Sequence, residues 1–342
     1  MQDKQTVTIL IPAYNEEKSI GKCVKSCLNQ TRRVDEVVVV NDGSTDNTLN
    51  LLKSFGSKIR IIDLKKNTGN KSKAQEIGLR CIKTDIFITT DADTRLHRNF
   101  VKNILKNFDD PEVSAVCGFI ESEKDNFYTR VREINYILSQ TIYKKAQNEV
   151  GAIIVLAGCS SAFKTDVFKK IVKFDHDNIT EDLDFTYKLK LADKKIKYDE
   201  NAVVYTQDPN NFKSYFKQLY RWYSGGWTCL KKNFRILKKP NNALILSLVY
   251  MDALIIGSLA LIAPILLFWN PLWFLYLVFA QLGFTVIAMT FGIIKMKRYD
   301  LYFYLPHYYI MNFMDQALFI FTFVKEVIVN KKNMKWHKAD RY

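Results

Sequence analysis

Two long apolar runs constrain this chain more than any other feature of its sequence. Residues 243–268 contain one charged residue, Asp252, and residues 272–294 contain none. As a helix, each run is long enough to cross about 30 Å of hydrocarbon. Asn270-Pro271 predicts a tight turn between them. The runs therefore predict a membrane domain, and two buried helices of a soluble bundle are the alternative.

A third apolar segment, residues 301–329, is interrupted by Pro306, His307 and Asp315. After two crossings, the basic residues 295–298 return to the inside, as the positive-inside rule requires. A third crossing would place the basic tail, residues 331–342, outside and against that rule. We expect either a third span or a kinked re-entrant or interfacial helix, with His307 and Asp315 as packing or interface residues.

A surplus of basic residues indicates an anionic partner. Lys and Arg number 50 against 35 Asp and Glu, which gives a net charge of +15. Such a charge suits nucleic acid, an acidic membrane face or a phosphate-bearing substrate. The basic residues are spread along the chain and cluster beside the apolar runs. Membrane lipids explain that distribution better, and we expect no nucleic-acid partner.

Composition and cysteine spacing exclude other classes. The 342 residues are 48% hydrophobic and 25% charged, so the chain is not disordered and is long enough for two units. Its six cysteines form no Cys-x-x-Cys pair, so no zinc knuckle is predicted. We expect reduced thiols of a cytoplasmic domain, with Cys23 and Cys27 as packing residues. The first residues are polar, so no signal peptide is expected.

Strand and helix patterns alternate over the first 90 residues. The β-branched runs predict buried strands at residues 6–11, 36–40, 59–63 and 85–90. Helical spacing follows three of these runs, at residues 16–28, up to residue 52, and at residues 72–83. The alternation predicts an α/β fold with a mostly parallel sheet and helices on both faces.

Polar clusters stand where three of these strands end, at residues 12–16, 41–46 and 91–93. Ligands of parallel sheets bind beyond the carboxyl ends of the strands, so we expect the clusters to converge into a site. Further along, residues 126–150 predict a long helix and residues 155–163 a small-residue stretch suited to close backbone approach.

Three motifs could carry chemistry, and each has a plainer explanation. The oxygens of Asp91 and Asp93 suit Mg²⁺ or Mn²⁺, which would neutralise a diphosphate, although a strand-end turn gives the same pattern. Thr180-Glu181-Asp182, at the start of a predicted helix over residues 178–191, could supply a general base or merely cap the helix. The QLYRW motif within residues 212–237 could be a solvated amphipathic face.

The order of the motifs IPAYNE, VVVVNDGSTD, DAD, TED and QLYRW resembles the family 2 glycosyltransferases with a GT-A fold. More narrowly, it resembles the membrane-embedded branch that contains cellulose, chitin, hyaluronan and poly-N-acetylglucosamine synthases. The resemblance covers about residues 6–230 and is followed by apolar segments in the expected place. The first two motifs are shared across the family, whereas TED together with QxxRW is more specific to this branch.

The resemblance implies a donor site. The uridine pocket would be lined by Pro12, Ala13, Tyr14 and Glu16. Asp42 would contact the base or the ribose. Lys71 stands where the family has a glycine-lysine segment near the nucleotide. Asp91 would lie near the ribose or the metal, and Asp93 would hold Mg²⁺ or Mn²⁺ on the diphosphate. After Lys71 the chain reads KSKAQEIG where the family often has KxxALNxG.

The resemblance also implies an acceptor side. Asp182 would be the general base that deprotonates the acceptor hydroxyl, with Glu181 beside it. The acceptor wall would be formed by Gln218, Arg221 and Trp222, with Arg221 close to the diphosphate leaving group. A single base and no protein nucleophile imply direct displacement, hence inversion at the anomeric carbon.

Three functions follow as hypotheses. The first is transfer of a sugar from a nucleotide-sugar, a UDP-sugar by the resemblance, to a growing polysaccharide. The second is non-processive transfer to a lipid acceptor, and the third is a non-catalytic membrane protein that binds sugar nucleotides. Two or three helices cannot easily enclose a polymer channel, so a polymerase of this kind would need a partner subunit or a homo-oligomer.

We expect four segments in an integral membrane protein whose catalytic domain is cytoplasmic. They are a GT-A domain at residues 1–211, an amphipathic interfacial segment carrying QxxRW at 212–240, a membrane domain of two or three helices at 241–330, and a basic tail at 331–342.

Overall fold

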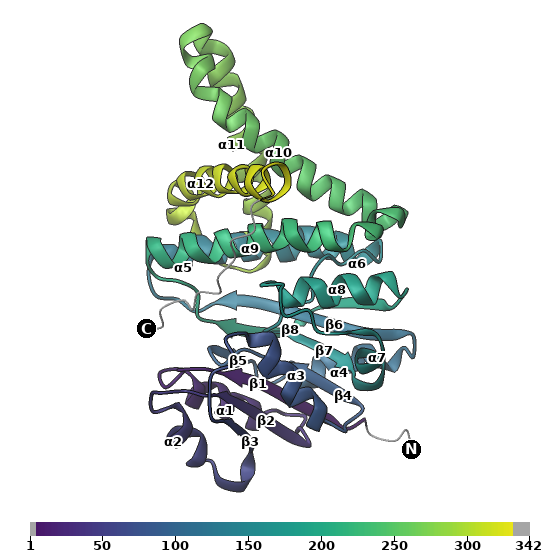
Figure 1. Cartoon of the computed structure of the whole chain (residues 1–342). Coiled ribbons are helices and arrows are strands. Elements are labelled where there is room, and N and C mark those ends of the chain that lie inside the picture. Colours follow the sequence, from purple (N-terminus) through teal and green to yellow (C-terminus); the bar gives the residue numbers. More distant parts are fainter. Residues whose placement is uncertain (1–4, 331–342) are drawn as a thin grey trace. The chain divides into compact units, whose positions relative to one another are not determined.

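The structure is a computed structural model that describes residues 5–330, so the basic tail lies outside the described residues. It contains two compact units (Figure 1). Unit 1 consists of residues 5–123 and 147–207, and unit 2 of residues 124–146 and 208–330. The units follow the packing of the chain, and the functional division into four segments stays a prediction.

Unit 1 is built on one sheet. Within residues 5–330 the sheet has eight strands: β1 (Val7–Ala13), β2 (Glu36–Asp42), β3 (Arg60–Leu64), β4 (Ile86–Thr89), β5 (Thr94–Leu96), β6 (Val113–Ser122), β7 (Ser161–Lys164) and β8 (Lys195–Thr206). Their order is β3-β2-β1-β4-β7-β6-β8-β5. The four strands from β3 to β4 are parallel, as are β6 and β8. The prediction of a mostly parallel α/β sheet is confirmed.

Two strands depart from the simple alternation. β7 lies antiparallel to both β4 and β6, and β5 lies antiparallel to β8. β7 occupies part of the small-residue stretch 155–163 that the sequence marked for close approach, and β5 directly follows the Asp91–Asp93 motif. Of the two antiparallel strands, β5 therefore lies next in sequence to predicted site residues.

The helices of unit 1 are α1 (Ile20–Leu28), α2 (Thr48–Lys53), α3 (Lys71–Cys81), α4 (Phe100–Lys106), α7 (Thr165–Ile171) and α8 (Glu181–Leu191). The α1 helix buries Ile20, Cys23, Val24 and Cys27 because their spacing places them on one face. Both cysteines are fully buried, which confirms their packing role. Short 3-10 turns at Gly56–Lys58 and Asn107–Asp109 complete the unit.

The α3 helix packs closely on the sheet, against β1 and β2. Its N-cap is Asn70, whose side chain accepts a hydrogen bond from the Ser72 amide at 2.9 Å. Gly78 lies on the face toward the sheet, where a Cβ would collide with the side chains of Leu10 and Val40. The missing Cβ lets the helix approach the strands, and this position of the helix fixes where Lys71, in its first turn, lies.

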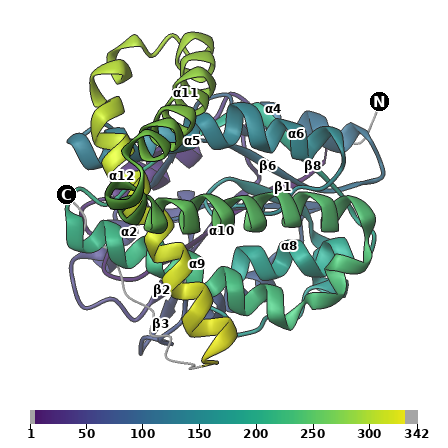
Figure 2. The same cartoon turned by 90° about the horizontal axis from the view of Figure 1, so that it is seen from above.

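Unit 2 is helical. It contains α5 (Phe127–Leu138), α9 (Phe212–Lys232), α10 (Pro240–Trp269), α11 (Pro271–Lys295) and α12 (Leu305–Phe323). The α5 helix continues through a π-helical turn at Ser139–Tyr143 into α6 (Lys144–Glu149), which confirms the long helix predicted over residues 126–150. The α12 helix packs against α5, α9 and α10, and Figure 2 shows it crossing α10.

The predicted turn between the apolar runs is present. The Asn270 side chain accepts hydrogen bonds from the amides of Leu272 (3.1 Å) and Trp273 (3.4 Å), and so caps α11. Among the described residues, one stretch, Pro240–Leu259, is long and apolar enough to cross a membrane, and Val286–Lys295 is a shorter apolar helix. A membrane domain of two or three crossings therefore stays a prediction.

The third apolar segment consists of a 3-10 turn (Tyr299–Tyr304), α12 and a π-helical turn (Val324–Ile328), with a further 3-10 turn at Phe234–Lys238 after α9. Asp315 is buried in α12 and accepts a hydrogen bond from the Tyr215 hydroxyl at 3.4 Å. The His307 ring lies 5.7 Å from the ring of Phe127. Asp315 is thus a packing residue of unit 2, and the exposed His307 contacts an aromatic ring at the surface, in agreement with the expectation of packing or interface residues.

Candidate functional site

One lysine joins two predicted motifs in unit 1. The Lys71 Nζ atom lies 2.6 Å from Asp91 Oδ1 and 3.1 Å from Glu181 Oε1. The start of α3, the end of β4 and the start of α8 therefore meet at one ammonium group. We call Lys71, Asp91, Glu181 and Asp182 the lysine–carboxylate cluster.

Asp182 has an unusual environment in this cluster. Burial, and then the charge of Glu181, raise the pKa of the Asp182 carboxyl to about 6, although Lys71 acts in the opposite direction. Its Oδ1 accepts from the Leu183 amide at 2.9 Å, and its Oδ2 from the Gly158 amide at 3.4 Å. The carboxylate is thus held at the start of α8 and can exchange a proton near neutral pH.

The small-residue stretch lies against this cluster. A Cβ on Gly158 would lie 3.3 Å from Lys71 Nζ and 3.9 Å from the Asp182 Cβ. The backbone of Gly158 therefore comes as close as the sequence predicted. Thr180 is the N-cap residue of α8, but its side chain makes no cap hydrogen bond and instead donates to Asn178 Oδ1 at 3.0 Å. The acids Glu181 and Asp182 lie in the first turn of α8, so the favourable charge at the helix start is present beside the proposed base.

Lys71 remains a cation in this setting. Burial lowers the pKa of its ammonium group, but the charges of Asp91 and Glu181 outweigh burial, and the net effect raises the pKa. The ammonium group of Lys71 can exchange a carboxylate partner for an entering phosphate, because phosphate oxygens accept the same charge-assisted hydrogen bonds.

The first polar cluster follows β1. Pro12 and Ala13 are buried in that strand, and Tyr14 is half-buried after it. Asn15 has a positive φ of 55°, which turns the chain sharply at the strand end. Glu16 is buried, and its Oε2 accepts a hydrogen bond from the Ser19 hydroxyl at 2.9 Å. The predicted pocket residues thus come from one strand and the turn that follows it.

Asn15 connects this turn to the second polar cluster. Its amide donates to Ser44 Oγ at 3.0 Å, and its Oδ1 accepts from the Thr45 amide at 2.7 Å. The Glu16 amide donates to Thr48 Oγ1 at 2.7 Å. The carboxyl ends of β1 and β2 are therefore tied together by side chains, and these two of the three polar clusters converge as predicted.

Asp42, at the end of β2, binds the chain that leads to Lys71. Its carboxylate accepts hydrogen bonds from the Thr68 amide and the Thr68 hydroxyl, both at 2.9 Å. Burial raises the pKa of Asp42, although the bonds from Thr68 act against it. The next residue, Gly43, has a φ of +68°, and a Cβ there would collide with the backbone of Lys66 and Asn67. The predicted contact of Asp42 with a base or ribose stays a prediction.

The carboxylates of Asp91 and Asp93 suit a metal ion whose other ligands are water and substrate phosphates. Among residues 5–330, no three His, Cys, Asp or Glu side chains form a metal-binding group. Asp91 and Asp93 both follow β4, the Asp91 side chain is 32% exposed, and Asp93 is nearly buried with its Oδ1 accepting from Thr94 Oγ1 at 3.2 Å. Mg²⁺ is often bound by one or two carboxylates, with water and substrate phosphates as the other ligands. This arrangement suits such an ion.

A second charged cluster lies in unit 2, around the QLYRW motif of α9. The Arg132 guanidinium of α5 lies 4.4 Å from the Tyr215 ring centre and 4.8 Å from that of Trp222. Its Nη2 donates to Gln218 Oε1 at 3.2 Å, and its Nε lies 3.8 Å from Asp208 Oδ1. With Asp315, which binds Tyr215, we call these residues the arginine–aromatic cluster.

The structure therefore brings Gln218 and Trp222 together through a residue that sequence reasoning missed. Arg221 is half-buried and lies outside this cluster. Arg132 stands in the chain between Val131 and Ile134, which belong to the apolar core of unit 2. The sequence held one indication of this role: Arg132 is a charged residue on an apolar helical face, and a buried charge needs partners.

Other structures share this fold, which is of the GT-A type. A mannosyltransferase from Pyrobaculum calidifontis, solved in complex with GDP-Man and Mn²⁺, matches 96% of this chain and 89% of its own chain with a TM-score of 0.66 and 20% identity. A fragment of S. aureus TarS in complex with UDP-GlcNAc matches 70% of this chain and 69% of its own, with a TM-score of 0.50 and 17% identity.

The sequence comparison gives the family. Residues 8–172 match the model of "Glycosyl transferase family 2", and the chain carries a domain of that family. It is 29% identical over 244 residues to a poly-beta-1,6-N-acetyl-D-glucosamine synthase of Staphylococcus epidermidis, covering 68% of this chain and 57% of the relative. The Staphylococcus aureus protein of that name is 28% identical over 238 residues, with 68% and 58% covered. The chain thus spans a little over half the length of these relatives, and the family 2 glycosyltransferase domain expected from the motifs is confirmed.

Proposed function

We propose that this protein transfers a sugar from a nucleotide-diphosphate sugar to a hydroxyl of a growing polysaccharide, with inversion at the anomeric carbon. The observation that carries the proposal is Asp182, a carboxylate whose pKa is raised to about 6 beside Lys71. It is the only carboxyl group described here that combines a pKa close to neutral with a place in the family motif.

The reaction needs a base on one side of the sugar and a stabilised leaving group on the other. Asp182 takes the proton of the acceptor hydroxyl as the new C–O bond forms, and the bond from the anomeric carbon to the diphosphate breaks. Lys71 exchanges its carboxylate partners for the departing phosphate oxygens, and Arg221 adds a second positive charge to that side. Since one base acts and no protein group attacks, the configuration inverts.

A divalent cation, Mg²⁺ or Mn²⁺, would neutralise the diphosphate charge when bound. Asp93, with Asp91 beside it, would hold the cation. The related fold solved with GDP-Man and Mn²⁺ supports this choice, as do the oxygen-only donors at the end of β4.

We propose a UDP-sugar donor, with UDP-GlcNAc as the first to be tested. The supporting facts are the names of the relatives, poly-beta-1,6-N-acetyl-D-glucosamine synthases, and the related fold bound to UDP-GlcNAc. Pro12, Ala13, Tyr14 and Glu16 would line the uridine pocket, with Asp42 reaching the base or ribose after Thr68 releases it.

We also propose an integral membrane protein with its catalytic domain in the cytoplasm. The stretch Pro240–Leu259 supports this proposal, as do the apolar side chains at the α10–α11 turn, where Phe268 is 90%, Trp269 84% and Leu272 76% exposed. Exposed apolar and aromatic side chains on this scale suit lipid. Membrane lipids are the proposed partners, and a partner subunit or a second copy would complete a polymer channel.

The test is transfer from a panel of radiolabelled UDP-sugars by the purified full chain in lipid, with Mn²⁺ or Mg²⁺, and sizing of the product after lipid extraction. Asp182→Asn is expected to lower the rate of transfer by about 10²–10⁴ and keep nucleotide binding. The matched control is Asp177→Asn, an exposed carboxylate in the loop before α8, which is expected to retain activity.

The product then decides between acceptors. A long water-soluble product supports the polysaccharide proposal, and a short organic-extractable product replaces it with glycolipid synthesis. Nucleotide binding without any transfer, in wild type as in D182N, would overturn the enzyme proposal in favour of a binding protein.

A further inference from the structure

We propose that Arg132 is a positioning residue for the acceptor side of the reaction. Its guanidinium fixes the ring of Trp222 and the amide orientation of Gln218, so that these two side chains present one defined surface to a sugar. This inference rests on the proposed function, because it gives that surface an acceptor to bind.

The contacts of Arg132 with α9 all lie on one face of that helix. Tyr215, Gln218 and Trp222 are three and four residues apart, which places them on the same side of a helix. All three touch the same guanidinium: one ring at 4.4 Å, the other at 4.8 Å and the Gln218 oxygen at 3.2 Å. A single side chain of α5 therefore sets the arrangement of the QxxRW face.

The charge of Arg132 is compensated inside unit 2. The side chain is 3% exposed, and its nearest acid, Asp208, is 1% exposed. Asp208 also accepts a hydrogen bond from the Tyr136 hydroxyl at 2.9 Å, and Asp315 accepts one from Tyr215. A buried cation that is stacked between two rings and faced by two acids has little freedom to move, so it can hold its neighbours in place.

The contact with Gln218 has a direction. A guanidinium carries only hydrogen-bond donors, so the side of the Gln218 amide that faces it must be the oxygen. The amide nitrogen then points away from Arg132, and Gln218 is half-buried rather than enclosed. Gln218 therefore offers its two N–H groups outward, where a sugar hydroxyl can accept them.

Lysine could not replace arginine here. A guanidinium is flat, stacks on aromatic faces and donates in several directions at once, whereas an ammonium group is a compact, strongly hydrated charge. Lysine would keep the positive charge and lose the stacking with Tyr215 and Trp222. The substitution Arg132→Lys thus separates positioning from charge, and Arg132→Met removes both.

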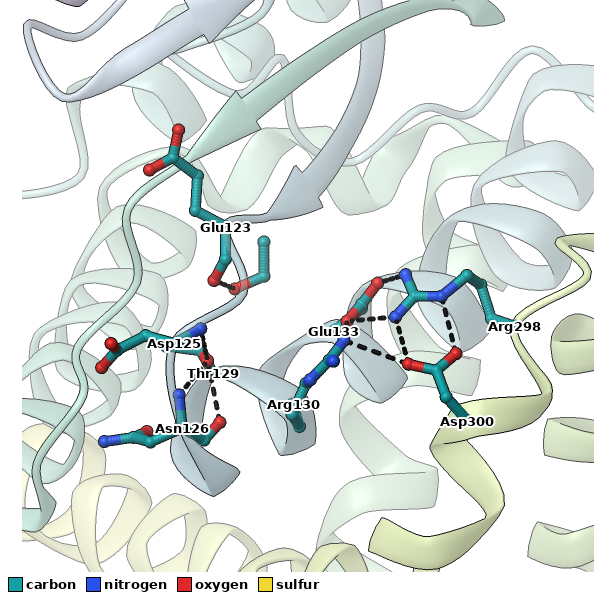
Figure 3. Close-up of polar contacts among 9 residues, drawn as sticks. Glu123, Asp125, Asn126, Thr129, Arg130, Glu133, Arg298 and Asp300 are labelled. Atoms are coloured by element: carbon teal, nitrogen blue, oxygen red, sulfur yellow. Dashed lines mark hydrogen bonds and ion pairs between the residues drawn. The ribbon is translucent and has the colours of Figure 1, made fainter.

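The same helix offers a matched control. Arg130 belongs to a different ion-pair group, in which it lies 3.1 Å from Glu133 and 3.2 Å from Asp300, while Arg298 binds both of these acids (Figure 3). Arg130 has no contact with Gln218 or Trp222 among the interactions of the described residues. Arg130→Met therefore removes an arginine from α5 without touching the acceptor surface.

The first experiment is steady-state transfer by the full chain in lipid nanodiscs. R132K and R132M are expected to raise the KM for the acceptor about tenfold, the effect of roughly one lost hydrogen bond, and to leave the KM for the UDP-sugar unchanged. R130M is expected to change neither constant. An equal loss in both R132 variants and R130M, or an unchanged acceptor KM in R132M, would overturn the proposal.

The second experiment does not depend on activity. The chain is labelled with 5-fluorotryptophan, and the Trp222 signal is assigned in the ¹⁹F NMR spectrum by its loss in Trp222→Phe. R132K and R132M are expected to shift that signal, and R130M is not. An unshifted Trp222 signal in R132M would overturn the positioning role. If wild type transfers no sugar while the shift is present, the proposed function fails and the positioning geometry stands.

A third variant tests the direction of the Gln218 amide. Gln218→Glu keeps an oxygen facing Arg132 and replaces the outward nitrogen by a second oxygen. The Trp222 signal is expected to stay in place, and the acceptor KM is expected to rise as in R132M. A normal acceptor KM in Q218E would show that the outward N–H groups are not used.

Discussion

The two charged clusters of this protein are built in opposite ways. In unit 1 one cation, Lys71, faces the carboxylates of Asp91, Glu181 and Asp182, so negative charge is in excess, and the side chains of Lys71 and Asp91 are 21% and 32% exposed. In unit 2 one cation, Arg132, is 3% exposed and packed between two rings. The first cluster is partly exposed and has more carboxylates than cations, whereas the second encloses its one cation.

This difference indicates that the reaction is expected at the lysine–carboxylate cluster and acceptor recognition at the arginine–aromatic cluster. A site that changes charge during a reaction needs groups whose protonation can change, such as Asp182. A surface that selects an acceptor needs groups that do not change, such as a buried guanidinium and an aromatic ring. The predictions below test this contrast, from the largest expected effect on activity to the smallest.

The largest effect is expected for Asp182→Asn. Loss of a general base lowers the rate by about 10²–10⁴, measured as kcat with saturating acceptor.

The stability of the same variant, D182N, should not fall with its activity. Because the pKa of Asp182 is raised to about 6, its favourable contribution to folding is present at low pH and is lost as the pH rises through 6. At pH 7.5 the melting temperature of D182N is expected to equal or exceed that of wild type, and a clear fall would contradict the described environment.

Lys71→Met is expected to have the next largest effect, about 10²-fold on kcat/KM, because the leaving phosphate loses a fixed charge. The donor KM should rise, and the acceptor KM should stay near the wild-type value. The opposite pattern would place Lys71 on the acceptor side and remove the contrast between the clusters. Lys73→Met is the control, since it removes a neighbouring lysine that takes no part in the ion pairs with Asp91 and Glu181.

The pH dependence gives a smaller effect with a definite sign. Asp182 must be ionised to act as a base, so kcat/KM is expected to fall about tenfold per pH unit below pH 6. Lys71 lowers the pKa of Asp182, so in K71M the inflection should move to higher pH. The R132M profile should keep the wild-type inflection. An inflection that moved with Arg132 instead would show that the clusters titrate together.

The smallest effect on activity is expected for Arg298→Met. Glu133 is 2% exposed and binds Arg298 and Arg130, so loss of Arg298 leaves a buried carboxylate with fewer partners. The cost is about 1–3 kcal/mol of stability, visible as a lower melting temperature by scanning fluorimetry. The acceptor KM should remain normal, in contrast to R132M. A raised acceptor KM would show that any weakening of unit 2 disturbs the acceptor surface.

The strand-end motifs could be predicted because their signals are local. The runs TVTILI and EVVVV can be buried as strands, and the polar residues after each must then stand at one edge of a parallel sheet. The order of the motifs supplied the family, and the family supplied Lys71 and Asp182. No rule about spacing would have joined Lys71 to Glu181, which lies 110 residues further along the chain.

What the sequence did not predict depends on tertiary contacts. β7 and β5 are short, and their antiparallel direction is decided by the strands that they meet. Arg132 could not be assigned to Gln218 and Trp222, because α5 and α9 are far apart in the chain and an arginine gives no sign of its partner. Asp42 was assigned to a nucleotide, and its bonds to Thr68 come from a loop whose path no local pattern specifies.

Gly78 has a consequence that reaches beyond its own turn of helix. It lies seven residues after Lys71 in α3, a separation of about 10 Å along a helix. Its missing side chain sets the height of that helix above Leu10 and Val40. An alanine at this position would push α3 away from the sheet and move Lys71 away from Asp91 and Glu181. Displacements of about 1 Å in an active site can lower the rate 10²-fold. A mutational screen restricted to polar positions would therefore overlook Gly78, which sets the position of Lys71 although it has no side chain.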